Sequence, residues 1–98
     1  MTRLLLTGFE PFGDSDRNPS LEIVRALDTR TIGGAQVTSR ILPVSMQRIA
    51  AALDKVLDEA KPDIVLSLGL AGNESMIRIE RYGVNLADFP IADNDGRR

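Results

Sequence analysis

The sequence KPDIVLSLGLAG, at residues 61–72, decides the fold class. Lys61-Pro62-Asp63 is typical of a helix end, because proline cannot continue a helix. The apolar residues that follow predict a strand over 63–68, which by its composition is the most buried of the chain. In α/β proteins, the loops that follow such strands carry the binding and catalytic groups. The glycine-rich bend at 69–72 is therefore a candidate site.

Five other segments are expected to be extended or turned. Residues 3–8 include three consecutive leucines, as in a strand of a sheet covered on both faces. Residues 36–44 have two mixed faces, which favours a strand nearer the sheet edge. Residues 76–80 and 82–86 alternate well enough to be extended, and Asn94-Asp95-Gly96 is typical of a turn.

Two helices are expected between these strands. Asn18 followed by Pro19 is a typical helix start, with asparagine as N-cap and proline at the first helical position. Ser45 can cap a second helix over 46–60, whose apolar stripe is Ile49, Leu53, Val56 and Leu57. The order strand, helix, strand, helix, strand indicates one α/β domain with a mostly parallel sheet. Two helices cover such a sheet thinly, so we expect the chain to be part of a longer protein.

Composition narrows the possible functions. The 98 residues are 43% hydrophobic and 27% charged, as in a small globular domain. The net charge of −2 offers no basic surface for nucleic acid or membranes. No apolar run could span a bilayer and no signal peptide is recognisable, which favours the cytoplasm. The sequence has no Cys and no His, which excludes disulfides, thiolate and imidazole metal sites, and a cysteine nucleophile within this chain.

Three residues are candidates for binding or chemistry. Phe9 and Phe12 lie three apart on a glycine-framed loop and could form two walls of an apolar pocket. The alternative, which the pattern alone favours, is that both pack the loop onto the sheet. Glu80 could accept a proton or orient a base that does. The alternative for Glu80, again favoured by pattern alone, is an exposed ion pair with Arg78.

Three loops resemble ligand sites without meeting their requirements. The loop 8–13 has the glycine spacing of a phosphate loop, but Asp14 and Ser15 replace the required Lys and Ser/Thr. The bend at 69–72 has only fragments of a dinucleotide fingerprint, and the pattern alone favours a plain bend from strand to loop. Residues 93–96 are similar to a calcium loop, but the preceding ligand position is Ile91 and no Glu closes the site. None of the three loops is therefore interpreted as a metal or cofactor site.

A set of motifs nevertheless points to one enzyme family. In order, the motifs are TGFEPFG (7–13), NPS (18–20), LPV (42–44), KPD (61–63), GLAG (69–72), IER (79–81), VN (84–85) and DNDG (93–96). Over nearly the whole chain, these motifs closely resemble the N-terminal half of the pyrrolidone-carboxylate peptidases (pyroglutamyl peptidase I, cysteine peptidase family C15).

The resemblance implies a fold and an activity. The fold is a three-layer, phosphorylase/hydrolase-like α/β sandwich with a mostly parallel central sheet, of which residues 1–98 form the N-terminal half. The activity is removal of N-terminal pyroglutamyl (5-oxoprolyl) residues from peptides by a Cys-His-Glu triad, without metal or cofactor. The full-length enzyme is expected to be a cytoplasmic homotetramer. In the triad, the carboxylate holds the imidazole in the right tautomer and stabilises its cation.

The resemblance also assigns residues. Glu80 matches the triad glutamate. Phe9 and Phe12 match aromatic residues that hold the flat pyroglutamyl ring between them. Three further apolar residues are assigned to substrate binding, and Asn18 to organising the oxyanion region; the apolar residues are Val44, Leu70 and Ile91.

Two departures from the family qualify the assignment. The Cys and His of the triad belong to a C-terminal half that these 98 residues do not include, so this chain alone should be inactive. Pro90 occupies the place of an arginine common near the active site. Two alternatives to an enzyme half remain open: a non-catalytic remnant that binds a small ligand between Phe9 and Phe12, and a partner-binding α/β module that pairs through its uncovered sheet.

Overall fold

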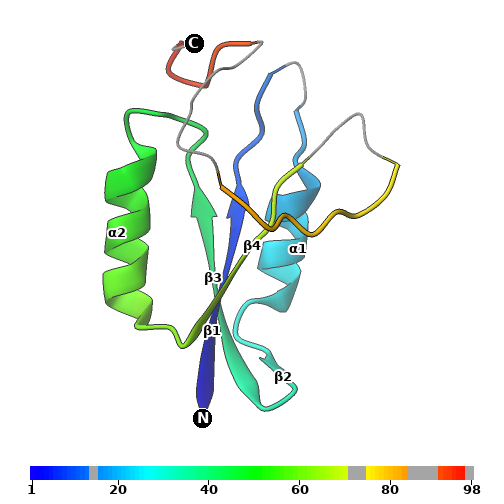
Figure 1. Cartoon of the computed structure of the whole chain (residues 1–98), viewed down its shortest axis with the longest axis vertical. Helices are drawn as coiled ribbons and strands as arrows, with labels where there is room; N and C mark the ends of the chain where they lie inside the picture. The colour runs from blue at the N-terminus through cyan, green and yellow to red at the C-terminus, as the bar shows by residue number, and fades with distance from the viewer. Residues whose placement is uncertain (14–15, 71–74, 84–90, 97–98) are drawn as a thin grey trace.

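A four-stranded, mostly parallel sheet forms the centre of the chain in the computed structural model (Figure 1), which describes residues 1–13, 16–70, 75–83 and 91–96. The strand order is β2-β3-β1-β4. β1 pairs in parallel with both β3 and β4, and β2 pairs antiparallel with β3. The elements are β1 Thr2–Phe9, α1 Pro19–Leu27, β2 Thr31–Ile32, β3 Ala35–Leu42, α2 Ile49–Ala60 and β4 Ile64–Ser67.

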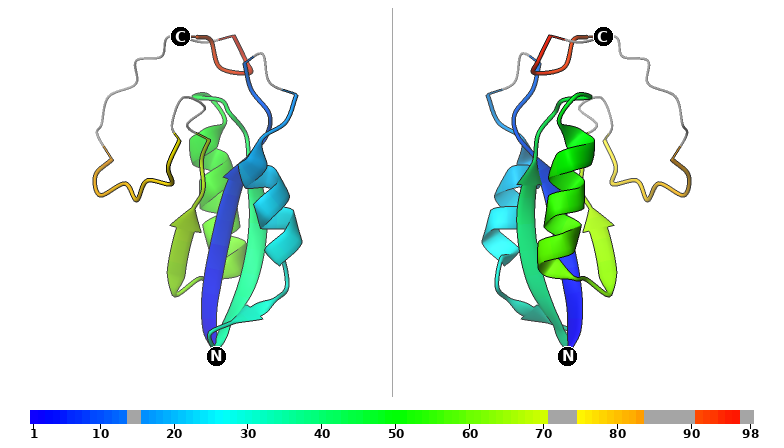
Figure 2. Two further views of the ribbon diagram at one scale, coloured as in Figure 1. Left: turned by 90° about the vertical axis from the view of Figure 1, so that its right-hand side faces the viewer. Right: turned by 90° about the vertical axis from the view of Figure 1, so that its left-hand side faces the viewer.

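The two helices lie on opposite faces of the sheet, so the fold has three layers (Figure 2). Successive side chains of a strand point to opposite faces, and neighbouring leucines of β1 therefore enter different cores. Leu5 packs with Leu42 and Val56 on the α2 side, whereas Leu6 packs with Val24 and Val37 on the α1 side. The expected α/β sandwich with a mostly parallel sheet is confirmed.

The start of α1 follows the predicted cap. Asn18 has an extended backbone and its Oδ1 accepts a hydrogen bond from the Ser20 backbone N at 3.0 Å. Pro19 is the first helical residue. A Cβ added to Gly8 would lie 2.6 Å from the Ser20 carbonyl oxygen, so α1 packs on β1 more closely than any other residue would allow.

The second helix begins later than predicted. Residues 46–48 form a turn, and α2 starts at Ile49 rather than Met46. Ser45 still caps this turn, since its Oγ accepts from Arg48 N at 3.1 Å and its carbonyl oxygen from Ile49 N at 2.9 Å. The predicted end is confirmed: Lys61 adopts a left-handed conformation with φ 46° and donates its N–H to the Leu57 carbonyl oxygen.

The β3 segment differs from its prediction in extent and neighbours. The strand ends at Leu42 rather than Val44, and it lies one strand in from the edge. The edge position belongs to β2, a two-residue strand that the sequence analysis did not identify. β2 and β3 are joined by a turn at Gly33-Gly34, where both glycines have positive φ.

The prediction that 63–68 is the most buried strand is wrong for this chain. β4 is an edge strand, and Ile64, Val65 and Leu66 are 52%, 47% and 50% exposed. Composition indicates that a strand suits burial, but burial itself needs elements that pack on it. Within the part of the chain that the structure describes, β1 is the one strand paired with β4.

The expected extended segments after β4 do not form strands in the described residues. Residues 75–83 carry no strand assignment and their side chains are exposed, Ile77 at 97%. An alternating sequence becomes a strand only where a sheet edge pairs with it. Three of the sequence-based expectations involve residues outside those the structure describes: 71–72 of the glycine bend, 84–86 of the second extended segment, and Pro90.

The two helices of the described residues are short, with 9 residues in α1 and 12 in α2. Neither α1 nor α2 is long and apolar enough to cross a membrane.

Candidate functional site

An apolar pocket of about 480 Å³ lies at the carboxyl ends of β1 and β3. This is the edge of a parallel sheet at which α/β proteins bind ligands, and the volume suits a small molecule. Three segments form the walls: the end of β1 with its following loop, the β3–α2 connection, and residues 91–93. The lining residues are Phe9, Phe12, Pro43, Val44, Ser45, Met46, Ile49, Ile91, Ala92 and Asp93.

Four of the residues predicted to bind substrate meet in this pocket: Phe9, Phe12, Val44 and Ile91. Phe9 is the last residue of β1 and also packs against the core cluster of Leu5, Leu42 and Val56. The core interpretation and the pocket interpretation therefore both hold for Phe9. Phe12 is half-buried in the loop that follows and lines the pocket without belonging to that cluster.

Two other predicted residues lie elsewhere. Leu70 is half-buried in the segment after β4 and does not line the pocket. Glu80 is exposed in the irregular segment 75–83 and does not line it either. Within the described residues, the candidate carboxylate is therefore not part of the pocket lining.

Asn18 is buried, with 2% of its surface exposed, and its side-chain amide forms hydrogen bonds with Glu10 and Ser20. Its Oδ1 accepts from Ser20 N at 3.0 Å and from Ser20 Oγ at 2.7 Å, while its Nδ2 donates to the Glu10 carbonyl oxygen at 3.2 Å. Ser20 Oγ in turn accepts from Phe9 N at 3.0 Å. Asn18 thus fixes the backbone between the two phenylalanines.

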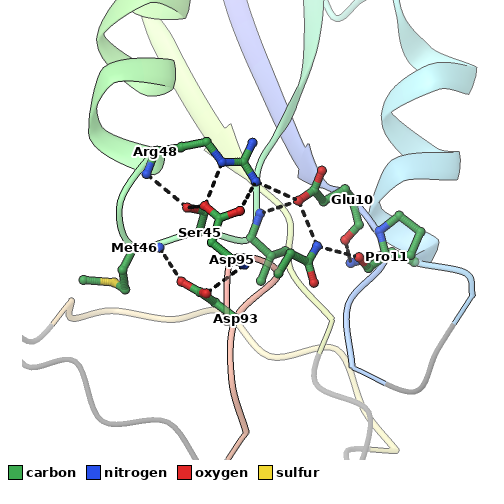
Figure 3. Close-up of polar contacts among 10 residues, drawn as sticks. Glu10, Pro11, Ser45, Met46, Arg48, Asp93 and Asp95 are labelled. Atoms are coloured by element: carbon green, nitrogen blue, oxygen red, sulfur yellow. Dashed lines mark hydrogen bonds and ion pairs between the residues drawn. The ribbon is translucent and has the colours of Figure 1, made fainter. Parts of the chain in front are cut away.

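A polar network that the sequence analysis did not identify adjoins the pocket (Figure 3). The Asp93-Asn94-Asp95-Gly96 turn is confirmed, with Gly96 N donating to the Asp93 carbonyl oxygen at 2.9 Å. Asp93 Oδ2 accepts from Met46 N at 2.8 Å. Asn94 contacts Glu10 across 84 positions of sequence, a pairing that no local spacing could reveal.

The same turn forms an ion pair with the start of α2. Arg48 donates through Nε to Asp95 Oδ2 at 2.8 Å and through Nη2 to Oδ1 at 3.0 Å, and Ser45 Oγ also donates to Oδ2. The hydrogen bonds from Arg48 and Ser45 hold the pKa of the Asp95 carboxyl below its usual value. Asp95 in turn raises the pKa of Arg48.

The acidic residues of this turn are committed to protein donors. In the described parts of the chain, no three His, Cys, Asp or Glu side chains gather as a metal would require. The sequence of the turn is similar to a calcium loop, but its carboxylates bond Met46 N, Arg48 and Ser45 instead.

Comparison with known proteins identifies the family. The sequence model described as pyroglutamyl peptidase matches residues 2–98. The chain belongs to the pyroglutamyl peptidase family. It is 48% identical to the pyrrolidone-carboxylate peptidase of Thermococcus litoralis over 96 residues, which are 98% of this chain and 44% of that protein. It is 47% identical to the Pyrococcus furiosus enzyme of the same name, covering 98% of this chain and 46% of that protein.

Solved structures of these relatives show the same fold. The T. litoralis pyrrolidone carboxyl peptidase superposes with a TM-score of 0.95 at 47% identity, covering 100% of this chain and 44% of that chain. The P. furiosus peptidase gives 0.95 at 46% identity, with 99% and 47% covered. This member of the pyroglutamyl peptidase family therefore spans about half the length of the relatives it matches, namely their N-terminal half.

Proposed function

We propose that the chain is the N-terminal portion of a cysteine peptidase that removes N-terminal pyroglutamyl residues from peptides. The observation that carries the proposal is the apolar pocket. Phe9, Phe12, Val44 and Ile91 converge on it at the carboxyl ends of parallel strands, in a chain that belongs to the pyroglutamyl peptidase family. The cytoplasmic location and the homotetrameric state implied by the resemblance are part of the same proposal.

The pocket suits the chemistry of a pyroglutamyl ring. That ring is a flat five-membered lactam, whose nitrogen is an amide and carries no charge. Aromatic and aliphatic walls can contact both faces of such a ring. An ordinary N-terminal residue carries an ammonium group, which is costly to bury among apolar side chains without a partner. The same walls therefore favour the cyclised terminus over an open one.

In the proposed mechanism, Glu80 supplies one of the three catalytic groups. A cysteine thiolate attacks the carbonyl carbon of the pyroglutamyl residue, and a histidine carries the proton to the leaving amine. Glu80 would orient that histidine and stabilise its cation. Since the 98 residues contain neither Cys nor His, both must come from the remainder of the enzyme.

The other assigned residues have supporting roles in the proposal. Asn18 fixes the backbone around Glu10 and so organises the region next to the reacting carbonyl. Leu70 does not line the pocket of these 98 residues, and the proposal assigns its apolar contact with the substrate to the full-length enzyme. Neither residue takes part in proton transfer.

The substitution Glu80→Gln tests the catalytic part of the proposal. In the full-length gene product it should lower kcat for a pyroglutamyl amide by about a thousandfold or more, because the imidazolium loses its anionic partner. The melting temperature should stay nearly unchanged, since glutamine keeps the shape of glutamate and can still accept a hydrogen bond. Glu59→Gln, an exposed glutamate of α2, is the matched control and should leave kcat unaltered. A near-normal rate in Glu80→Gln would remove Glu80 from the triad.

A further inference from the structure

One residue bonds together the three segments that form the pocket walls. Asn94 Nδ2 donates to Glu10 Oε1 at 2.8 Å and to the Pro11 carbonyl oxygen at 2.9 Å. Its backbone N donates to the Val44 carbonyl oxygen at 2.9 Å. Asn94 therefore connects its own segment to the loop after β1 and to the β3–α2 connection.

Glu10 completes this arrangement from the opposite side. Its Oε1 accepts from Val44 N at 3.1 Å as well as from Asn94. One carboxylate oxygen of the loop after β1 therefore binds both the β3–α2 connection and the segment of Asn94. Arg48 Nη2 lies 3.9 Å from the same oxygen and adds a favourable charge. Each of the three segments is thus held to both others (Figure 3).

The bonded residues stand next to the walls in sequence. Phe12 follows Glu10 by two positions, Val44 is itself bonded, and Ile91 precedes Asn94 by three. Ile91 packs closely on the first loop, because its Cδ1 would lie 3.1 Å from a Cβ added to Gly13. A small shift of the 91–96 segment would therefore change the spacing between Ile91 and the aromatic wall.

We propose that Asn94 is a positioning residue that fixes the separation of the pocket walls carried by Phe12, Val44 and Ile91. Its consequence for ligands rests on the proposed function: the fixed separation would set the fit to a flat lactam ring. Asparagine suits the position because its amide supplies two N–H donors, and its two partners here are both acceptors.

Asn94→Asp is the sharpest test of this role. Aspartate has the same shape but offers only acceptors, so it would oppose the Glu10 carboxylate and the Pro11 carbonyl without a bond to either. Gln47→Glu is the matched control, because it adds the same charge to an exposed residue of the neighbouring 46–48 turn. Both variants are made in the full-length gene product.

Two measurements are compared between the wild type and the variants. The first is wall geometry, measured as the nuclear Overhauser effect between the Ile91 δ-methyl and the Gly13 α-protons and as hydrogen exchange of the Val44 and Asn94 amides. The second is the dissociation constant of 2-pyrrolidinone, the unsubstituted lactam. Asn94→Asp should weaken the Overhauser effect, speed both exchanges by about tenfold or more, and raise the dissociation constant by about tenfold. Gln47→Glu should change none of these quantities.

A second substitution keeps the test decisive if Asn94→Asp unfolds the protein. Glu10→Gln in the Asn94→Asp background removes one of the opposed charges and returns a donor to face the new carboxylate, while its amide oxygen can still accept from Val44 N. The double variant should therefore recover folding and most of the wall geometry. If the effects of Asn94→Asp and Glu10→Gln on folding and wall geometry are simply additive, the two side chains are not coupled and the proposal is overturned.

The outcomes separate this inference from the proposed function. Unchanged exchange and an unchanged Overhauser effect in a folded Asn94→Asp protein would overturn the positioning role. If Asn94→Asp alters the wall geometry but not the dissociation constant of 2-pyrrolidinone, the claim that Asn94 sets the fit to the lactam ring is overturned. If the wild type fails to bind 2-pyrrolidinone while the geometry responds as expected, the positioning role stands and the pyroglutamyl pocket is refuted.

Discussion

At the scale of single residues, the two phenylalanines of the first loop line the same pocket but differ in their other contacts. Phe9 ends β1 on the face shared by Leu5 and packs into the α2-side core, whereas Phe12 lies beyond the strand. The sequence could predict an apolar pair on a tight loop. It could not divide their roles, because that division depends on where β1 ends.

The contrast between the phenylalanines gives a prediction for alanine substitutions. Phe12→Ala should raise KM for a pyroglutamyl amide by about tenfold, since it removes one wall, with little change in melting temperature. Phe9→Ala should weaken binding and also lower the free energy of unfolding by roughly 1–3 kcal/mol, less than the cost at a fully buried site. Steady-state kinetics and urea unfolding measure both. A Phe12→Ala enzyme that loses only stability would mean that Phe12 is a core residue.

Asp95 gives a prediction about pH. Its pKa is lowered in the folded state by Arg48 and Ser45, so its charge stabilises the fold above the unfolded value of 3.8. That contribution is lost as the pH falls below 3.8 through the lower, folded pKa. The wild type should therefore be more stable than Asp95→Asn at neutral pH, and the difference should shrink in acid. Urea unfolding across this pH range measures the difference in stability. A difference that grew in acid would contradict the ion pair between Asp95 and Arg48.

At the scale of elements, the local patterns were accurate where the structure depends on neighbouring residues. Asn18 and Pro19 start α1 as predicted, because the cap bonds a backbone N–H only two residues away. The start of α2 was misplaced for the opposite reason. The 46–48 turn is held by the Asp93 carboxylate, which accepts from Met46 N, and by the Asp95 carboxylate, which accepts from Arg48. Each aspartate lies 47 residues after its partner, so no local pattern contains that information.

The packing of α1 on β1 depends on Gly8. In Gly8→Ala the new Cβ would lie 2.6 Å from the Ser20 carbonyl oxygen and 2.8 Å from Val24 Cγ2, so the helix would have to move away from the strand. We expect a loss of about 1–3 kcal/mol in the free energy of unfolding. Gly69→Ala is the control, because its Cβ would meet no atom of the described residues within 4 Å, and it should change stability by less than about 0.5 kcal/mol. Equal effects in urea unfolding would contradict the close packing.

At the scale of the whole molecule, the order of the elements in the sequence predicted the three-layer architecture. It did not predict how exposed β4 is. Its apolar side chains suit a buried strand, yet they are about half exposed in a chain that spans about half the length of its relatives. Of the ten residues that line the pocket, the motifs shared with the family had pointed to four, Phe9, Phe12, Val44 and Ile91, and not to the other six. The Glu10–Asn94 bonds were not predicted, because they join loops at opposite ends of the chain.

The most direct test of the central claim is the release of a fluorescent amine from a pyroglutamyl amide. The 98-residue chain is assayed alone and beside the longest product of the same gene, with a prolyl amide as the control substrate. We predict hydrolysis of the pyroglutamyl amide by the longer product only, because the triad needs a Cys and a His that these residues lack. Activity of the 98-residue chain alone would contradict the proposed thiol mechanism, and no activity in either product would favour a non-catalytic or partner-binding role.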